Sequence, residues 1–432
     1  MPPLTVDQLH ASLGDPLLGS IGFLNEVMGR YPDAVSFAPG APHPSLFSEI
    51  DIGSCIRRFI AHLVHERGLA VSQARRTLFE YGPSRGLIND LVADTLRRDH
   101  GMDVHSDSVV ITAGAQEGML LCLRALCAGP RDVLAIVDPC FAGVTGAARL
   151  LGVPVVGVDE SPEGVDLDSL RKECRAARLR GQRIRACYVA PDFSNPGGSR
   201  MPLESRRSLL DVAEREDFYV LEDNAYGFTA PMGADIPQLK ALDTGRRVLH
   251  IGTFAKVCFP GARVGYVVAD QPVQEDGGHQ LLARHLAALK SMVTVNTSPL
   301  GQAVIGGMLL EHGGSLIELS RTKAALYRRN LVHLADALDQ NLRDTHPRIR
   351  WNHPGGGFFV RVRIPVRADM ELLAVSAEKY GVLWTPMSQF YLGSAGDYEL
   401  RLSCSYLTPE EIDEGVRRLT GFLRKETLHP HR

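Results

Sequence analysis

This chain of 432 residues lacks the features that define several large classes of protein. No apolar run approaches the ~20 residues that cross a bilayer, so no membrane partner is expected. The net charge is only -3 and basic residues form no dense run, which argues against binding to nucleic acid or to an anionic membrane. The first residues include Asp7, Gln8 and His10 and show no charged-then-apolar signal pattern, so we expect a cytoplasmic location.

The cysteine pattern gives no sign of a disulfide framework or of a metal site. Eight cysteines are scattered along the chain, with no CxxC pair and no histidine at a metal-ligand spacing. We therefore expect no bound metal and interpret the cysteines as reduced core residues. They are Cys55, Cys122, Cys127, Cys140, Cys174, Cys187, Cys258 and Cys404.

Lysine is scarce, and one lysine has an unusual setting. Only seven of the 47 basic residues are lysines. Lys256 lies in IGTFAKVCFPGARVGY (residues 251–266), just past an apolar run that is typical of a strand, between Thr253 and Arg263. A lysine among small residues, with a hydroxyl and a guanidinium nearby, suggests an amine that holds an aldehyde cofactor. The residues near the lysine would then bind the phosphate of that cofactor. The alternative is a surface lysine in a strand-to-turn segment.

The length and composition predict an ordinary soluble protein with two domains. The composition, with 44% hydrophobic and 22% charged residues, is that of an ordinary soluble protein. At 432 residues the chain is too long for one small core. Residues 1–45 are interpreted as an N-terminal arm that is part of the small domain, 46–320 as the large domain and 321–432 as a small C-terminal α+β domain. In the arm we expect a short amphipathic helix around Leu18–Met28, followed by a proline-rich extended loop (residues 36–44).

Apolar β-branched runs alternate with helical patterns in the middle of the chain. The helical patterns include Gln116–Leu126 and Ser205–Glu216. This alternation predicts an α/β fold in which a mostly parallel sheet lies between helices. Ligands bind such sheets beyond the carboxyl ends of the strands, so the residues after each run are site candidates. The seven runs are Val109–Thr112, Val133–Val137, Val153–Val158, Ala186–Val189, Phe218–Leu221, Val248–Ile251 and Val264–Val268.

The last third of the chain predicts a connecting helical region and a smaller α+β domain. Residues from about 275 to 340 have a helical pattern, with Leu281–Met292 and Ser320–Asn341 as its clearest parts. Beyond them, short apolar runs alternate with helical patterns at Glu371–Tyr380 and Pro409–Lys425.

Five successive strand ends carry unusual residues. The segments after the first, second and fourth runs are TAGAQE (112–117), DPCFAG (138–143) and PDFSNPGG (191–198), the fifth run ends in EDNAY (222–226), and the sixth leads into the lysine segment. The first segment is a glycine turn that opens a helix and offers backbone N–H groups to an anion. Each turn alone is common, whereas five at successive strand ends indicate one shared site.

Together these stretches resemble the fold-type I pyridoxal phosphate enzymes, in particular the class I/II aminotransferases of the kynurenine and aminoadipate branch. The resemblance covers the chain from about residue 20 to about residue 425. It implies a large domain with a seven-stranded sheet, pyridoxal 5'-phosphate as cofactor, and a homodimer with shared active sites. The implied reaction exchanges an amino group between an L-α-amino acid and a 2-oxo acid by a ping-pong aldimine and ketimine mechanism. Such reactions include steps of specialised amino-acid or natural-product biosynthesis. The identities of the amino donor and of the 2-oxo acid acceptor stay open.

The resemblance assigns roles at the cofactor ring. Lys256 matches the lysine that forms the internal aldimine, and Asp223 matches the aspartate paired with the pyridine nitrogen. Tyr226 and Asn195 match donors to the ring's phenolic oxygen, and Phe141 matches the aromatic residue stacked on the ring. Asp223 should stay ionised, because a protonated ring nitrogen makes the ring an electron sink. The structural alternatives are a helix cap for Asp223, a turn residue for Asn195 and a core residue for Phe141.

At the phosphate, Arg263 matches the binding arginine, and Ala115 and Gln116 fall at the phosphate-binding turn. Thr253 stands where the family has a hydroxyl, and Tyr81 where a tyrosine reaches the phosphate of the partner subunit. Planar guanidinium forks suit phosphate and carboxylate groups.

For the substrate, Arg401 matches the arginine that binds the carboxylate, with Asn195, Gly40 and Phe359 as further contacts. Side-chain specificity is expected in the arm and in the loops 355–359 and 384–391.

Four positions depart from the family's pattern. Ala255 and Ala115 replace serines, so two hydroxyls for the phosphate are lost and backbone N–H groups carry more of its charge. Gly22 stands where relatives can carry an arginine, and Met387 replaces a common glycine. These changes leave room for a lyase, cyclase or oxidase on the same fold. A transcription regulator is a third alternative, but only some 35 residues precede the Phe37 segment and they contain no basic recognition helix.

Overall fold

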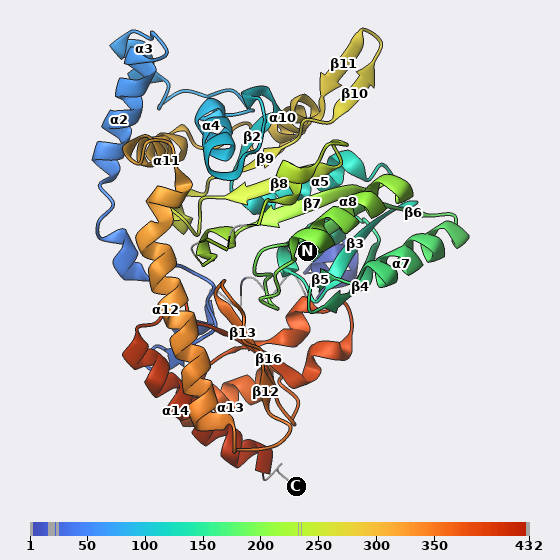
Figure 1. Ribbon diagram of the computed structural model, residues 1–432, viewed down its shortest axis with the longest axis vertical. Helices are drawn as coiled ribbons and strands as arrows, with labels where there is room; N and C mark the ends of the chain where they lie inside the picture. Colours follow the sequence, from blue (N-terminus) through green and yellow to red (C-terminus); the bar gives the residue numbers. More distant parts are fainter. Residues whose placement is uncertain (1–2, 16–21, 23–25, 232, 235, 429–432) are drawn as a thin grey trace.

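The computed structural model describes residues 3–15, 22, 26–231, 233–234 and 236–428. Figure 1 shows a large sheet layered between helices, a smaller sheet-and-helix body beside it, and helix α12 (Leu316–Leu342) running from one to the other. Most of the helix expected around Leu18–Met28 lies outside the described residues. In the part of the chain that is described, no helix is both long enough and apolar enough to cross a membrane.

The large sheet contains all seven predicted strands and one more. Its order is β2-β9-β8-β7-β6-β3-β4-β5, and the added strand β5 is only two residues long and pairs antiparallel with β4. Strand β9 is also antiparallel to both of its neighbours, whereas the pairings from β8 through β7, β6 and β3 to β4 are all parallel, so the sheet is mostly parallel, as predicted. The strands are β2 (Val109–Thr112), β3 (Asp132–Asp138), β4 (Val155–Ser161), β5 (Gly164–Val165), β6 (Arg183–Val189), β7 (Tyr219–Asn224), β8 (Val248–Thr253) and β9 (Gly265–Val268).

Helices cover both faces of this sheet because alternate strand residues are apolar on both sides. Leu134 and Leu221 pack in one core with α5 (Ala115–Leu126), α6 (Ala142–Leu150) and α10 (Leu282–Val293). Their neighbours along the strands pack in a second core on the opposite face. The helices of that face are α7 (Leu167–Leu179), α8 (Leu203–Glu216) and α9 (Leu239–Leu242). Successive residues of one strand therefore face different environments, which matters for the site below.

Helices from distant parts of the chain pack over the β2 and β9 side of the sheet. A Cβ at Gly307 would lie 2.1 Å from the backbone oxygen of Cys55, so this glycine allows α11 to approach α2 closely. The helices in this layer are α2 (Ile52–His65), α3 (Val71–Arg76), α4 (Asn89–His100) and α11 (Pro299–Glu311).

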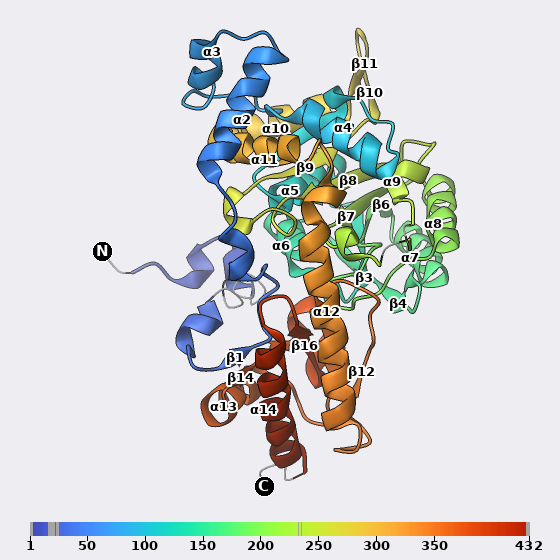
Figure 2. The same ribbon diagram turned by 60° about the vertical axis from the view of Figure 1, so that its left-hand side comes forward.

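The smaller body combines the C-terminal third of the chain with part of the N-terminal arm. Strand β1 of the arm pairs in parallel with β14, and Figure 2 places both beside α13 and α14. Phe37 of the arm and Trp384 are buried in the same core. The boundaries at residues 45 and 320 stay a prediction. The elements are β1 (Val35–Ser36), α12 (Leu316–Leu342), β12 (Arg350–Trp351), β13 (Phe359–Arg363), α13 (Met370–Tyr380), β14 (Val382–Leu383), β15 (Thr385–Pro386), β16 (Glu399–Ser403) and α14 (Pro409–Leu428).

One predicted helical region begins later than expected. The chain from Pro272 to Leu281 forms an antiparallel hairpin of β10 (Pro272–Glu275) and β11 (Gly278–Leu281), which projects from the molecule in Figure 1. Gly278 has φ of 127°, a conformation that glycine adopts readily and that interrupts a helix. The helical pattern therefore starts at Leu282.

The described cysteines are all buried and free. Among the described residues, no group of three or more metal-binding side chains is clustered.

Candidate active site

Lys256 follows β8 at the carboxyl edge of the large sheet. Its Nζ donates a hydrogen bond of 2.6 Å to the backbone oxygen of Gly40, which brings the N-terminal arm to the lysine. The pKa of the amine is lowered to about 8, mainly by burial and then by the positive charges of Arg401 and Arg263, whereas the charge of Asp223 opposes this shift. The amine is therefore neutral in a useful fraction near neutral pH, as a nucleophile or a base must be.

Asp223 lies near the end of β7, in register with Ile251 of β8. Its carboxyl is buried, and Oδ2 accepts a hydrogen bond of 2.6 Å from the hydroxyl of Tyr188 on β6. The other oxygen, Oδ1, is also buried but has no hydrogen-bond partner among the described residues. Burial raises the pKa of Asp223 to about 6, and the Tyr188 hydrogen bond limits this rise. The site thus presents a carboxylate oxygen that lacks one donor.

The turn between β2 and α5, residues 112–116, is called the cradle below. Gly114 has φ of 81°, and a Cβ there would lie 2.6 Å from Nη2 of Arg263, so glycine is required on both counts. Nη2 of Arg263 donates a hydrogen bond of 3.3 Å to the backbone oxygen of Ala113. Helix α5 begins at Ala115, and the first N–H groups of a helix have no partner within it. The cradle is therefore a group of backbone donors beside a guanidinium, which suits an anion.

Three further candidates adjoin neighbouring strand ends. The Gln116 side chain donates through Nε2 to the backbone oxygen of Gly143 at 2.7 Å, so its amide nitrogen is already engaged. Phe141 precedes the first residue of α6 and is half-buried. The hydroxyl oxygen of Thr253 accepts a hydrogen bond of 3.1 Å from the backbone N–H of Ala255.

Arg401 on β16 is a buried cation from the smaller body. Its Nη1 donates to Oδ1 of Asn195 at 2.7 Å and its Nη2 to the backbone oxygen of Ala38 at 3.0 Å. The guanidinium carbon lies 4.2 Å from the ring centre of Phe359 and 4.7 Å from that of Phe390. Burial lowers the pKa of Arg401 to about 10, and Nε has no partner among the described residues. A cation held this way can bind a carboxylate strongly.

Asn195, Tyr226, Gly40 and Phe359 complete the group around Arg401. Tyr226 is buried and hydrogen-bonded to Asn195, and burial raises the pKa of its hydroxyl. The Tyr226 and Phe359 rings meet edge to face with centroids 5.6 Å apart. A Cβ at Gly40 would lie 2.8 Å from Cζ of Phe359, so a side chain at Gly40 would displace this ring.

Tyr81 is the candidate that the structure does not join to the others. It is 88% exposed, and no hydrogen bond or ring contact connects it to the candidates within the described residues.

Two residues of the site were missed from the sequence. Tyr188 occupies the predicted strand 186–189, and a tyrosine in an apolar run is the only signal that could have marked it. Phe390 lies in the 3-10 turn Met387–Phe390, inside a loop that was expected to set specificity but where no single residue stood out.

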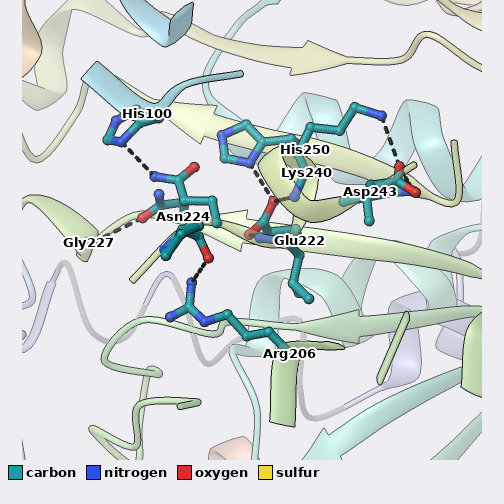
Figure 3. A network of polar contacts seen from close by, with 12 residues as sticks. His100, Arg206, Glu222, Asn224, Gly227, Lys240, Asp243 and His250 are labelled. Atoms are coloured by element: carbon teal, nitrogen blue, oxygen red, sulfur yellow. Dashed lines mark hydrogen bonds and ion pairs between the residues drawn. The ribbon is translucent and has the colours of Figure 1, made fainter. Parts of the chain in front are cut away.

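A second polar network lies on the opposite face of the same strand. Figure 3 shows Glu222, the neighbour of Asp223, pointing to His250 and to the backbone of Lys240. His250 Nδ1 lies 2.8 Å from Oε2 of Glu222, and the N–H groups of Leu239 and Lys240 donate to the same carboxylate. Burial raises the pKa of Glu222, but these hydrogen bonds outweigh it and the net pKa is lowered. The network fixes the end of β7 from behind.

The family model described as aminotransferase class I and II matches residues 59–419. The chain belongs to this family. The resemblance seen in the sequence is thereby confirmed.

Similar proteins cover almost the whole chain. The (S)-3,5-dihydroxyphenylglycine transaminase of Amycolatopsis orientalis is 47% identical over 428 residues, which span 99% of this chain and 96% of that protein. The 2-aminoadipate transaminase of Thermus thermophilus is 30% identical and covers 91% of both chains. The crystal structure of α-aminoadipate aminotransferase from Thermus thermophilus, complexed with N-(5'-phosphopyridoxyl)-L-leucine, has a TM-score of 0.78 at 28% identity and covers 97% of both chains.

The chain is thus an aminotransferase with pyridoxal phosphate as its cofactor, and the comparisons do not favour the lyase, cyclase, oxidase or regulator alternatives. The residues present fit this cofactor. Oδ1 of Asp223 has no hydrogen-bond donor among the described residues, and a protonated ring nitrogen would supply one. The pKa of the Lys256 amine is lowered, which suits an amine that reacts with an aldehyde. The cradle has no side chain at Gly114 to obstruct a phosphate.

Proposed function

We propose that this aminotransferase acts on α-arylglycines, amino acids whose aromatic ring is bonded directly to Cα, and on the corresponding 2-oxo acids. The observation that carries the proposal is the 47% identity with (S)-3,5-dihydroxyphenylglycine transaminase over 99% of the chain. The rings of Phe359 and Phe390 beside Arg401 support it. An aryl ring one bond from Cα stays close to the carboxylate, so aromatic side chains that flank the carboxylate-binding group are the ones it can contact.

Arg401 binds the substrate carboxylate in this proposal. Its guanidinium is held by Asn195 and by the backbone oxygen of Ala38, and its buried Nε is a further donor. A fixed planar fork orients the amino acid, and orientation decides which bond at Cα can break. Gly40 and Phe359 then limit the space on one side of the substrate.

Lys256 and Asp223 carry the chemistry. When bound, pyridoxal phosphate supplies an aldehyde for the amino group and a protonated ring that draws electrons from Cα. Nζ of Lys256 would hold the aldehyde at rest and would then move the proton at Cα of the substrate. Oδ1 of Asp223 would accept the N–H of the ring, while Nδ2 of Asn195 and the hydroxyl of Tyr226 would donate to the phenolic oxygen. Tyr188 keeps the Asp223 carboxyl in place.

The cradle and Arg263 bind the phosphate. With Ala115 and Ala255 in place of serines, the donors are the backbone N–H groups at Ala115 and Gln116, the hydroxyl of Thr253 and the guanidinium of Arg263. Phe141 would supply the aromatic face for the cofactor ring.

A homodimer completes the site. Tyr81, Phe79 and Met292 are 88%, 83% and 86% exposed, and large exposed apolar side chains of this kind support an interface with a second copy. Tyr81 then reaches the phosphate bound by the partner. The free, buried cysteines support a reducing compartment, and we place the protein in the cytoplasm.

The test compares kcat/KM for several amino donors with one 2-oxo acid as acceptor. Phenylglycine and 3,5-dihydroxyphenylglycine are compared with phenylalanine, kynurenine and 2-aminoadipate. We expect the arylglycines to exceed the other donors by about tenfold or more, since one methylene in a fitted pocket changes specificity by this order. A preference for phenylalanine or 2-aminoadipate would show that the substrate class is wrong, while the family assignment would stand.

A further inference from the structure

A buried ion pair lies directly behind the cradle and has no role in the function described so far. Lys290 of α10 is fully buried, and its Nζ lies 3.0 Å and 3.3 Å from the two carboxylate oxygens of Glu117 in the first turn of α5. Thr294 joins both residues, because its hydroxyl oxygen accepts from Lys290 at 2.6 Å and its hydroxyl donates to Oε1 of Glu117 at 2.6 Å.

The Glu117 carboxylate is bound to the cradle itself. Its Oε2 accepts a hydrogen bond of 2.6 Å from the backbone N–H of Ala113. The backbone oxygen of Ala113 in turn accepts from Arg263, and the Thr112 hydroxyl donates to the backbone oxygen of Gly114 at 2.8 Å. The peptide groups on both sides of Gly114 are therefore fixed, and Ala113 has no N–H left for an anion.

Charge explains why a lysine accompanies this carboxylate. An ionised Glu117 behind an anion site would repel a phosphate, and the repulsion is strong at low local dielectric. Lys290 gives the pair no net charge, and Thr294 supplies the remaining hydrogen bond that a buried pair needs. The cluster thus provides a strong acceptor for Ala113 without opposing the phosphate.

We propose that Glu117, Lys290 and Thr294 are positioning residues that lock the cradle, so that the backbone N–H groups at Ala115 and Gln116 face the cofactor phosphate before it binds. This inference rests on the proposed phosphate role of the cradle. A rigid set of backbone donors loses little freedom on binding, which compensates for the two hydroxyls that are absent at Ala115 and Ala255. The cluster contacts neither substrate nor cofactor and acts through the turn alone.

The test uses two double variants of the apoenzyme that differ in one acceptor. Glu117→Gln with Lys290→Met removes both charges but keeps an amide oxygen for the Ala113 N–H. Glu117→Leu with Lys290→Met removes the acceptor as well, and replacing both partners of a buried pair with apolar residues avoids an unpaired charge. The affinities of pyridoxal phosphate and of pyridoxal are measured by absorbance titration, and their ratio reports the phosphate contribution.

We expect the ratio to fall by about tenfold or more in the Leu variant and by much less in the Gln variant, on the scale of one charge-assisted hydrogen bond to the phosphate. An equal ratio in the wild-type protein and both variants would overturn the proposal. Equal losses for pyridoxal and pyridoxal phosphate would also overturn it, since they would show a general structural role. Failure of the wild-type protein to prefer pyridoxal phosphate over pyridoxal would instead overturn the phosphate role of the cradle.

A measurement without variants covers the case in which the Leu variant does not fold. Amide hydrogen exchange of the wild-type apoenzyme is followed with and without inorganic phosphate. We expect phosphate to slow exchange at Ala115 and Gln116 and to leave Ala113 unchanged, because that N–H is already held by Glu117. Phosphate-dependent protection of Ala113 would contradict the proposal.

Discussion

Removing the Tyr188 hydroxyl tests how the site controls the charge of Asp223. Tyr188→Phe leaves the ring in its buried position and deletes one hydrogen bond, the one of 2.6 Å to Oδ2. Since Oδ1 has no partner among the described residues, both carboxylate oxygens would then lack a donor in the apoenzyme. Loss of this hydrogen bond therefore destabilises the ionised form of Asp223 more than the protonated form.

The size of the effect follows from the pKa. Asp223 has a pKa of about 6, above the value of about 3.9 in an unfolded chain, so ionising it costs about 3 kcal/mol of folding free energy at neutral pH. This part of the stability is present below about pH 4 and is lost as the pH rises through about 6. A hydrogen bond to a charged group contributes about 1.5–3 kcal/mol, so the variant should raise the pKa by about 1–2 further units.

The assay is thermal unfolding of the apoenzyme at pH 5 and at pH 8. We expect the variant and the wild-type protein to differ little at pH 5, where Asp223 is mostly protonated in both. At pH 8 the variant should unfold roughly 2–3 °C lower, from the expected entropy of unfolding of a chain of this size. Tyr327→Phe is a control that removes a buried hydroxyl elsewhere in the protein and should give a difference independent of pH. A Tyr188→Phe difference that is the same at both pH values would refute the reasoning.

Three further predictions concern the lysine and its surroundings. Lys256→Ala should fold normally and lower turnover by about 10⁴-fold or more, because it removes both the amine that holds the cofactor and the base, and wild-type rates in a purified variant would contradict its role. Reconstitution of the apoenzyme with pyridoxal phosphate, followed by absorbance, should accelerate as the pH rises to about 8 and then level off, because only the neutral Lys256 amine attacks the aldehyde and its pKa is about 8. A rate that stays flat from pH 6 to pH 9 would show that the amine is already neutral. Gly40→Ala should destabilise the protein by about 1–3 kcal/mol or displace the ring of Phe359 and raise KM, since its Cβ would lie 2.8 Å from that ring. Gly29→Ala is the control, because a Cβ there meets no atom of the described residues within 4 Å.

The sequence was sufficient to predict the strands of the large sheet and the candidate site residues at the ends of these strands. Buried parallel strands form continuous apolar runs, and their carboxyl ends meet at one edge, so the sequence alone places Asp223 and Lys256 together. The roles of Arg401 and Arg263 came from the family resemblance, which the family match supports. Their individual roles stay predictions.

Contacts between distant side chains could not be predicted in this way. The Tyr188 and Asp223 pair depends on the register of β6 and β7, and the Lys290 and Glu117 pair joins helices 173 residues apart in the chain. A one-residue shift of a strand would turn Tyr188 to the opposite face, and nothing in the local pattern specifies that register. The hairpin at Gly278 was missed because its short strands are exposed and lack an apolar run.

The most direct test of the account is a half-reaction without any acceptor. The purified enzyme, saturated with pyridoxal phosphate, is mixed with phenylglycine, and its absorbance and the released 2-oxo acid are measured together. The account predicts conversion of the cofactor to its aminated form with release of one 2-oxo acid per bound cofactor, followed by reversal when a 2-oxo acid is added. Release of ammonia or carbon dioxide, or continued turnover without an acceptor, would contradict amino transfer as the reaction of this site.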